Sequence, residues 1–321
     1  MDTSIFLAAN TGLGFVSAYE GFPPEGSFLH IVKGGPGTGK SGYMKAIREA
    51  ARRRGLDTLS VLCSGDPDSL DGLWIPALGM AWMDGTAPHV REPAAHGVDG
   101  DYVNLGRFCR TPFARRDREA AAALGAAYRA RYAAAYRLLR AAMELERAAE
   151  REAEPEELTR AEREIRARLA DRAPSARAYS LPARCWSSAL SCRGILRLDE
   201  TITELCKQIV EVPGGSGALE AARREAEVRG LRTVLCPRAL DPEQLEAVLL
   251  PEAGIAFVAE RRETAPPDER GELRARTLAL ALAELREAKR LHDRLEEISG
   301  RYMDFAALTE FTESTTARLF N

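Results

Sequence analysis

The stretch Gly34-Gly35-Pro36-Gly37-Thr38-Gly39-Lys40-Ser41 fits the pattern G-x-x-x-x-G-K-[ST] at every fixed position. In such a loop, successive backbone N–H groups point at an anion, and the following helix presents the positive end of its dipole to the same place. We expect this loop, with Gly42, to hold the phosphates of a nucleotide. Lys40 would reach the β- and γ-phosphates, and the Ser41 hydroxyl would ligate Mg²⁺.

The residues on either side of the loop fit this interpretation. Phe28-Leu29-His30-Ile31-Val32 is a short apolar run with β-branched residues, which is typical of a buried strand. Residues 42–54 have the spacing of a helix, and its apolar face is formed by Met44, Ile47 and Ala51. The sequence therefore predicts a strand, a phosphate-binding loop and a helix in succession.

Composition excludes several classes of protein. The chain has 321 residues, 45% hydrophobic and 29% charged, with a formal net charge of −3, so it has no basic surface of the kind that binds nucleic acid. We expect a cytoplasmic protein without membrane contact, because there is no basic leader and no run of 18 apolar residues. The six cysteines form no C-x-x-C pair, which argues against a zinc or dithiol motif and favours a reducing compartment.

Strands and helices alternate around the loop. Residues 4–19 should form a strand, a turn and a second strand, while Leu56–Cys63 and Leu78–Met83 should form the second and third core strands. Strands that alternate with helices predict βαβ units, so we expect a parallel sheet.

An Ala/Arg/Glu-rich region follows from Phe113 to about Ala153. Its apolar residues recur every three or four positions and predict one long helix; they are Leu124, Tyr128, Tyr132, Tyr136, Leu139 and Met143. Pro155 stands at the expected first turn of a second helix, which runs to about Arg172. The pair predicts a helical hairpin that projects from the α/β lobe.

After this hairpin the sequence repeats itself. Residues 6–14 match residues 186–194, and further matches follow in the same order. They pair Ile31-Val32 with Ile209-Val210, Leu56–Thr58 with Leu231–Thr233, Asp66-Pro67 with Asp241-Pro242, Pro76 with Pro251, and Thr86–Pro88 with Thr264–Pro266. Collinear matches of this kind predict a duplicated unit. The tail, from about Pro267 to Asn321, is again helical, with an apolar stripe of Leu291, Leu295, Ile298, Tyr302 and Phe305.

The second copy lacks the chemistry of the first. Its loop is Val212-Pro213-Gly214-Gly215-Ser216-Gly217-Ala218-Leu219, so in this alignment the first Gly, the Lys and the Ser become Val212, Ala218 and Leu219. Without an ammonium group or a magnesium-ligating hydroxyl, this loop should not hold a triphosphate well. We therefore expect the second lobe to be a structural partner.

The expected fold is α/β: a P-loop NTPase-like parallel sheet, duplicated as a degenerate second lobe, each with a helical hairpin. The predicted boundaries are 1–112 for the first lobe, 113–178 for its hairpin, 179–266 for the degenerate lobe and 267–321 for a C-terminal helical segment.

Comparing the two copies sorts the candidate acids, because a residue that serves the nucleotide should be lost with the lysine. Met80–Asp84 is an apolar strand that ends in a carboxylate, and its counterpart Ile255–Ala259 has no acid. We predict Asp84 as the acid on the magnesium side; the alternative is a turn carboxylate before Gly85.

Other candidates are weaker. The acids of Asp66–Asp71 persist in the copy, and Asp-Pro is a good helix start, so helix capping is favoured, with Asp68 and Asp71 as further catalytic candidates. His89 could sense the γ-phosphate or position water, although a lone loop histidine is more often a surface or packing residue. The sequence does not choose among arginines for a charge-neutralising finger; the candidates are Arg91, Arg107 and Arg110.

Residues 6–106 resemble a family of bacterial P-loop ATP-binding proteins built from two related halves. The motifs that carry the resemblance are Ala9-Asn10-Thr11-x-x-Gly14-Phe15, Lys33–Ser41, Cys63-Ser64-x-Asp66-Pro67-Asp68-Ser69-Leu70-Asp71-Gly72, Asp84-Gly85-Thr86-Ala87-Pro88-His89 and Val103–Gly106. The resemblance implies ATP binding, ATPase activity and an unidentified client. It also favours His89 and Asp71 as site residues. The altered loop of the second half does not fit a mechanism with two ATP sites.

Three functions remain open at this point. The first is an ATPase that uses Lys40, Asp84, His89 and Asp71, with ATP and Mg²⁺ as ligands. The second is a kinase for a small molecule, with Asp66 or Asp71 as base. The third is a non-enzymatic nucleotide switch that binds a protein partner, because a phosphate loop leaves the acceptor undefined.

Overall fold

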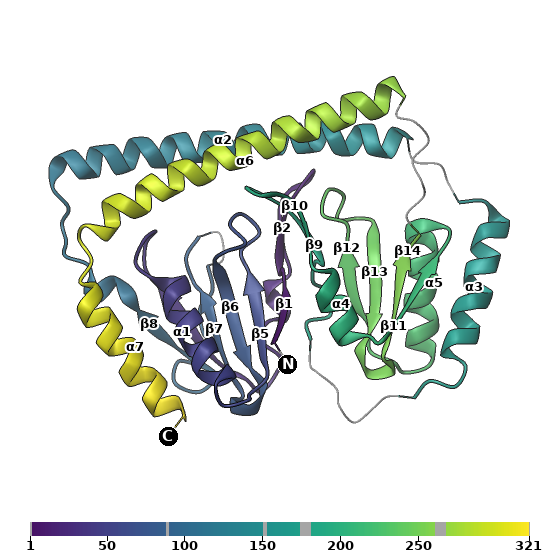
Figure 1. The fold of residues 1–321 in the computed structure, drawn as a ribbon, viewed down its shortest axis with the longest axis horizontal. Helices are drawn as coiled ribbons and strands as arrows, with labels where there is room; N and C mark the ends of the chain where they lie inside the picture. The colour runs from purple at the N-terminus through teal and green to yellow at the C-terminus, as the bar shows by residue number, and fades with distance from the viewer. Residues whose placement is uncertain (1, 88–89, 150–152, 174–180, 261–267, 321) are drawn as a thin grey trace. The chain divides into compact units, whose positions relative to one another are not determined.

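The computed structural model describes residues 2–87, 90–149, 153–173, 181–260 and 268–320. They form an α/β protein with a six-stranded mixed sheet, a second four-stranded mixed sheet and helices (Figure 1). The chain divides into two compact units. Unit 1 comprises residues 1–4, 25–134 and 283–321, and unit 2 comprises residues 5–24 and 135–282. The unit boundaries run through two long helices, between residues 134 and 135 and between residues 282 and 283.

The sheet of unit 1 surrounds the strand that leads into the glycine-rich loop. Its order is β1 (Asp2–Ile5), β5 (Thr58–Leu62), β6 (Leu70–Ile75), β7 (Met80–Asp84), β4 (Phe28–Lys33) and β8 (Gly100–Asn104). β4 pairs in parallel with both β7 and β8, whereas β6 is antiparallel to β5 and β7. Helix α1 (Lys40–Arg52) packs on this sheet through Met44, Ile47 and Ala51, the predicted apolar face.

The prediction of a parallel sheet is wrong, because the sheet is mixed. No helix connects β5 to β6, and only η2 (Pro76–Leu78) stands between β6 and β7. Connections this short join antiparallel neighbours, since a parallel neighbour needs a crossover of a dozen residues or more. Strand β6 (Leu70–Ile75) is not among the predicted strands, and the helix-capping interpretation of Asp66-Pro67 implies a helix at this place.

The helix-capping interpretation of Asp66 is therefore wrong as well. Residues 66–69 form a turn, in which the backbone N–H of Ser69 donates to the Asp66 carbonyl and the Ser69 hydroxyl donates to its carboxylate at 3.0 Å. The same turn precedes strand β13 (Leu245–Leu250) in the second half, where the Gln244 N–H donates to the Asp241 carbonyl. An Asp-Pro pair starts turns as well as helices, and the buried β-strand that follows decides between them.

Unit 2 contains the second sheet, in the order β11 (Gln208–Val212), β14 (Ile255–Ala259), β13 and β12 (Val234–Pro237). Helix α5 (Gly215–Val228) follows β11, and α4 (Asp199–Leu205) precedes it. Two short ribbons also belong to this unit, β2 (Ala8–Thr11) with β3 (Gly14–Ser17) and β9 (Ser188–Ser191) with β10 (Gly194–Arg197). Besides η2, the described residues of the two units form three short 3-10 turns: Tyr19–Gly21, Leu105–Phe108 and Pro251–Ala253.

The two sheets contain the same four-stranded arrangement. In unit 2, β11 is parallel to β14, while β13 is antiparallel to β14 and β12, as in β4, β7, β6 and β5 of unit 1. Even the bulge recurs, between Val61 and Leu62 in β5 and between Cys236 and Pro237 in β12. Matching topology and bulge agree with the duplication that the sequence predicts.

Four further helices are α2 (Arg115–Ala149), α3 (Pro155–Leu169), α6 (Glu269–Gly300) and α7 (Phe305–Phe320). The predicted stripe of α2 is confirmed where Leu124, Leu139 and Met143 are buried. α3 packs against α5 and α7 packs against α1, so each lies on a sheet-flanking helix rather than projecting (Figure 1). Among the described residues, no helix combines the length and apolarity needed to cross a membrane.

Candidate phosphate-binding site

The glycine-rich loop, residues 34–39, connects the end of β4 to the start of α1. Gly37 has φ +74° and Gly39, the residue that caps α1, has φ +85°. Both values lie in the left-handed region, which side-chain-bearing residues rarely adopt, so these glycines are needed for the loop's path. A tight loop followed at once by a helix brings several backbone N–H groups to one side.

Lys40 lies across this loop. Its ammonium group donates to the carbonyls of Gly34 and Gly35, at 2.7 and 3.0 Å, and is 3.6 Å from an oxygen of Asp84. An ammonium has three N–H donors, so the two carbonyls hold its position and leave the third beside the Asp84 carboxylate. The side chain is 12% exposed, which keeps the cation close to the loop.

The backbone donors of the loop are not used elsewhere in the described part of the chain. The N–H groups of Gly37, Gly39, Lys40 and Ser41 donate to none of the described residues, whereas Thr38 N–H makes a long contact of 3.4 Å to Gly35. The Thr38 hydroxyl also donates to Gly35, at 2.8 Å. Adjacent N–H groups without acceptors, next to a fixed ammonium, form a cradle for an anion.

Asp84 lies at the carboxyl end of β7, where it pairs with Val32 of β4 immediately before the loop. One carboxylate oxygen accepts from the backbone N–H and the hydroxyl of Thr86, at 2.9 and 2.6 Å, and the other faces Lys40. Burial raises the pKa of Asp84; the Lys40 charge and the Thr86 hydrogen bonds oppose this rise. Thr86 therefore fixes the rotation of the carboxylate and aims its second oxygen at the loop.

Asp71 is a second acid at the edge of the sheet where β4 and β7 end. It is 7% exposed and lies on β6 next to Gly72, which pairs with Met83, so Asp71 and Asp84 occupy the next positions along the two strands. The charge of Asp71 contributes to the raised pKa of Asp84, behind the larger effect of burial. The edge thus combines one lysine with two carboxylates.

Ser41 makes a contact that the motif alone does not suggest. Its hydroxyl oxygen accepts a hydrogen bond from the backbone N–H of Leu70, at 3.0 Å, which ties α1 to the start of β6. A hydroxyl oxygen has a second lone pair, and Asp84 has an oxygen that Thr86 does not use. These donors are all oxygen, the ligand type that Mg²⁺ prefers, so the residues present fit such an ion.

The other predicted candidates have their contacts away from Lys40 and Asp84. His89 lies outside the described residues, as do the Thr264–Pro266 repeat match and Pro88. Arg107 stacks on the rings of Phe108 and Phe311, and Arg110 donates to the carbonyl of Arg301. The remaining candidates have partners of their own: the Arg91 carbonyl accepts from Lys33, the Asp66 carboxylate is 3.4 Å from Lys289, and the Asp68 carbonyl accepts from Lys45.

Unit 2 shows how its loop differs, and the difference is larger than the sequence alignment indicates. Gly214, with φ +90°, caps α5 as Gly39 caps α1, and Ser216 accepts from Leu245 N–H at 2.9 Å as Ser41 accepts from Leu70. Only Pro213 lies between the end of β11 and Gly214, where unit 1 has residues 34–38 between Lys33 and Gly39. The loop is therefore four residues shorter, and Ser216 keeps the serine that the sequence alignment treats as lost.

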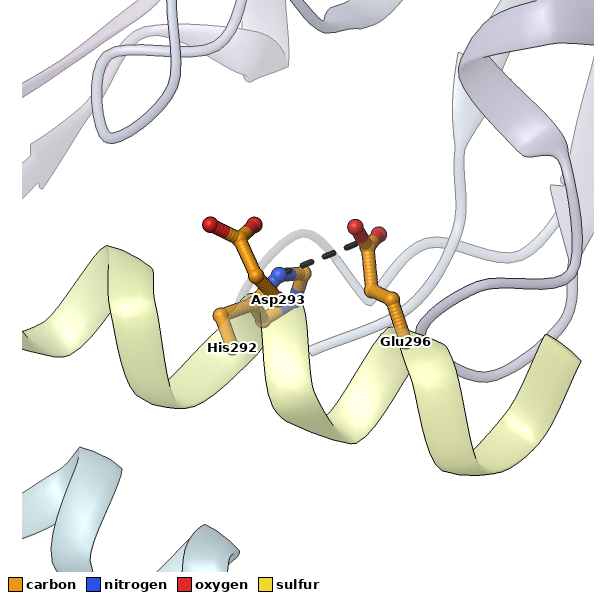
Figure 2. A group of neighbouring side chains, drawn as sticks. All are labelled: His292, Asp293 and Glu296. Carbon is orange, nitrogen blue, oxygen red and sulfur yellow. Dashed lines mark ion pairs between the residues drawn. The ribbon is translucent and has the colours of Figure 1, made fainter.

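Helix α6 contributes residues that sequence reasoning missed. A Cβ on Gly37 would be 2.6 Å from the carbonyl oxygen of Glu296, so α6 touches the loop backbone directly. Seven residues earlier, Lys289 pairs with Asp66 at 3.4 Å. Between them lies His292, whose Nδ1 is 3.8 Å from Glu296; Figure 2 shows this pair with Asp293. The sequence signal was a His-x-x-x-Glu spacing, which places both on one helix face but does not say what the face meets.

No protein-family model, curated protein or solved structure shows a significant match to this chain.

Proposed function

We propose that this protein binds ATP with Mg²⁺ at the glycine-rich loop of unit 1 and hydrolyses it, with unit 2 as a degenerate, non-binding copy. The observation that supports this most strongly is the geometry of Lys40: its ammonium is held by two loop carbonyls, beside four backbone N–H groups that no described residue uses. A triphosphate offers oxygens to all of these donors at once. The arrangement is that of a P-loop nucleotide site.

In this proposal the residues at the carboxyl edge of the unit 1 sheet have separate roles. The loop N–H groups and Lys40 bind the β- and γ-phosphates and neutralise charge that develops on them during transfer. Ser41 and the second oxygen of Asp84 would hold Mg²⁺, which screens the charge of the phosphate oxygens when bound. Thr86 keeps the Asp84 oxygen oriented, so the carboxylate does not need to reorganise when the nucleotide arrives.

The test is a comparison of the parent protein with Lys40→Ala. We expect the parent to bind ATP in the presence of Mg²⁺ by calorimetry and to release phosphate. Lys40→Ala should lose at least about tenfold in affinity, since a hydrogen-bonded charge contributes about 1.5–3 kcal/mol. Lys45→Ala is the matched control, because Lys45 lies one turn further along α1 and donates to the Asp68 carbonyl. Equal ATP affinities of Lys40→Ala and the parent would contradict the assignment of the nucleotide site to this loop.

A small-molecule kinase is the second candidate, and the position of Asp71 favours it. A buried carboxylate next to Asp84 can accept the proton of a substrate hydroxyl, as a catalytic base does in phosphoryl transfer. ATP consumption that starts only when a metabolite is added, and that Asp71→Asn abolishes, would support the kinase. Steady phosphate release without any metabolite supports the ATPase.

A further inference from the structure

We propose that His292 and Glu296 of helix α6 position the water that attacks the terminal phosphate. This inference rests on the proposed ATPase function and assigns the residues on the attacking side of the same site. Lys40 and Asp84 lie 3.6 Å apart on the loop side, where in the proposed function they would bind the phosphates and the cation. An in-line displacement also needs a group on the opposite side of the γ-phosphate, where the nucleophile stands.

Two contacts place α6 across the carboxyl edge of the sheet. β4, β5 and β7 run in the same direction, so the glycine-rich loop, the turn at residues 63–69 and Asp84 share one edge. Lys289 contacts Asp66 in that turn, and Glu296 contacts Gly37 in the loop. Seven helical residues span about 10 Å, so the helix segment between these contacts crosses the edge.

His292 lies on the same face as both contact points. Residues 289, 292 and 296 are three and four positions apart, a spacing that aligns side chains on one side of a helix. The His292 ring is 5.6 Å from the ring of Tyr128 on α2. The Tyr128 ring is 5.0 Å from the ring of Tyr132, and the Tyr132 hydroxyl would be 2.6 Å from a Cβ on Gly65, in the turn at residues 63–69. His292 therefore lies beside the same edge of the sheet as that turn.

Glu296 orients the imidazole. Its carboxylate is 3.8 Å from Nδ1 of His292, and Figure 2 shows the carboxylates of Asp293 and Glu296 extending to the same side of the helix. Asp293 is paired with Lys289, which leaves Glu296 as the partner of the ring. At 3.8 Å this is an electrostatic contact and not a hydrogen bond, and a carboxylate on this side favours the tautomer with the proton on Nδ1, which leaves Nε2 as the acceptor nitrogen.

The proposed step balances without a further reactant. The water oxygen forms a bond to the γ-phosphorus as the bond from that phosphorus to the β–γ bridging oxygen breaks, and its electron pair leaves with ADP. The proton of the water passes to Nε2 of His292, and from there to solvent. General base assistance of this kind contributes about 10²–10⁴-fold to the rate.

The test separates turnover from nucleotide affinity. His292→Gln should lower kcat about 100-fold, while the Kd for a non-hydrolysable ATP analogue stays within about threefold of the parent. Glu296→Gln should give a smaller loss of kcat, also without a change in Kd. Arg290→Ala is the matched control, because Arg290 is on the same helix, its side chain is 73% exposed and it forms an ion pair with Glu287, outside the proposed site.

Each of the following results would contradict the proposed role of His292. Unchanged kcat in His292→Gln overturns the inference while leaving ATP binding at the loop intact. Parallel losses of kcat and analogue affinity, or a lower thermal midpoint for His292→Gln than for Arg290→Ala, also overturn it, because they indicate a binding or structural role. A parent that binds the analogue but releases no phosphate contradicts hydrolysis itself, and with it this step.

Discussion

At the scale of single residues, the neighbours of Asp84 set both the pKa and the orientation of its carboxylate. Burial raises its pKa, and two hydrogen bonds from Thr86 together with the Lys40 charge oppose that rise. The same two hydrogen bonds occupy one oxygen, so the carboxylate presents only the other to the loop. The orientation depends on a neighbour two residues away in sequence.

Replacing Thr86 by Val should weaken binding of the magnesium–nucleotide complex. The substitution keeps the side-chain shape and removes the 2.6 Å hydrogen bond from the hydroxyl to Asp84. A hydrogen bond to a charged group contributes about 1.5 kcal/mol or more, which corresponds to about tenfold in the Mg²⁺ concentration for half-maximal nucleotide binding. Thr86→Ser should restore the parent value. A Thr86→Val protein with parental Mg²⁺ dependence would show that Thr86 does not orient the acid.

At the scale of elements, the two loop–helix junctions separate a structural role from a ligand role. Ser41 and Ser216 each accept a hydrogen bond from the first residue of an antiparallel strand, Leu70 or Leu245. The contact is therefore part of the repeated fold and does not by itself indicate metal binding. In unit 1 alone the serine follows a lysine and a full loop.

Ser41→Ala and Ser216→Ala should each lower the free energy of unfolding by about 1 kcal/mol, because each leaves a backbone N–H without its acceptor. Only Ser41→Ala should also weaken magnesium–nucleotide binding. Denaturant unfolding and calorimetry on the same two variants measure both effects. If nucleotide binding is equal in the two variants, Ser41 has only the structural role.

At this scale the sequence predicted individual helices and strands correctly, but it did not predict which strands pair or in which direction they run. The strand at residues 28–32, the helix after the loop and the long helix from residue 115 all form, since propensity and periodicity are local properties. Strand β6 was missed because Asp66-Pro67 suits a helix start as well as a turn. Strand direction depends on which neighbour a strand finds, and that is a non-local choice.

At the scale of the whole molecule, the two sheets contain similar four-stranded arrangements that are followed by different loops. The loop of unit 2 is four residues shorter than residues 34–38 and has Gly215 at the position of Lys40. Strand β14 ends with Ala259 where β7 ends with Asp84. The Leu158 side chain of α3 lies within 2.9 Å of a Cβ on Gly214, as Leu308 of α7 lies within 2.7 Å of one on Gly39. The supporting packing was kept and the anion site was not.

We therefore expect one nucleotide per chain. Calorimetry with a non-hydrolysable ATP analogue and Mg²⁺ should give a stoichiometry near one for the parent, and Lys40→Ala should show no remaining site, because unit 2 has neither the lysine nor the loop length. Two sites in the parent, or one site that persists in Lys40→Ala, would contradict the division between an active and a degenerate copy.

The sequence by itself determined the glycine-rich loop, the lysine and serine that follow it, the acid at the end of β7 and the collinear matches between its two halves. Each of these depends on residues that are adjacent or regularly spaced, so their chemistry is visible in one dimension. Only the tertiary structure decided that the sheets are mixed, that Ser41 contacts β6 and that α6 reaches the loop at Glu296. Those features join residues that are distant in sequence, and packing of complete elements selects them.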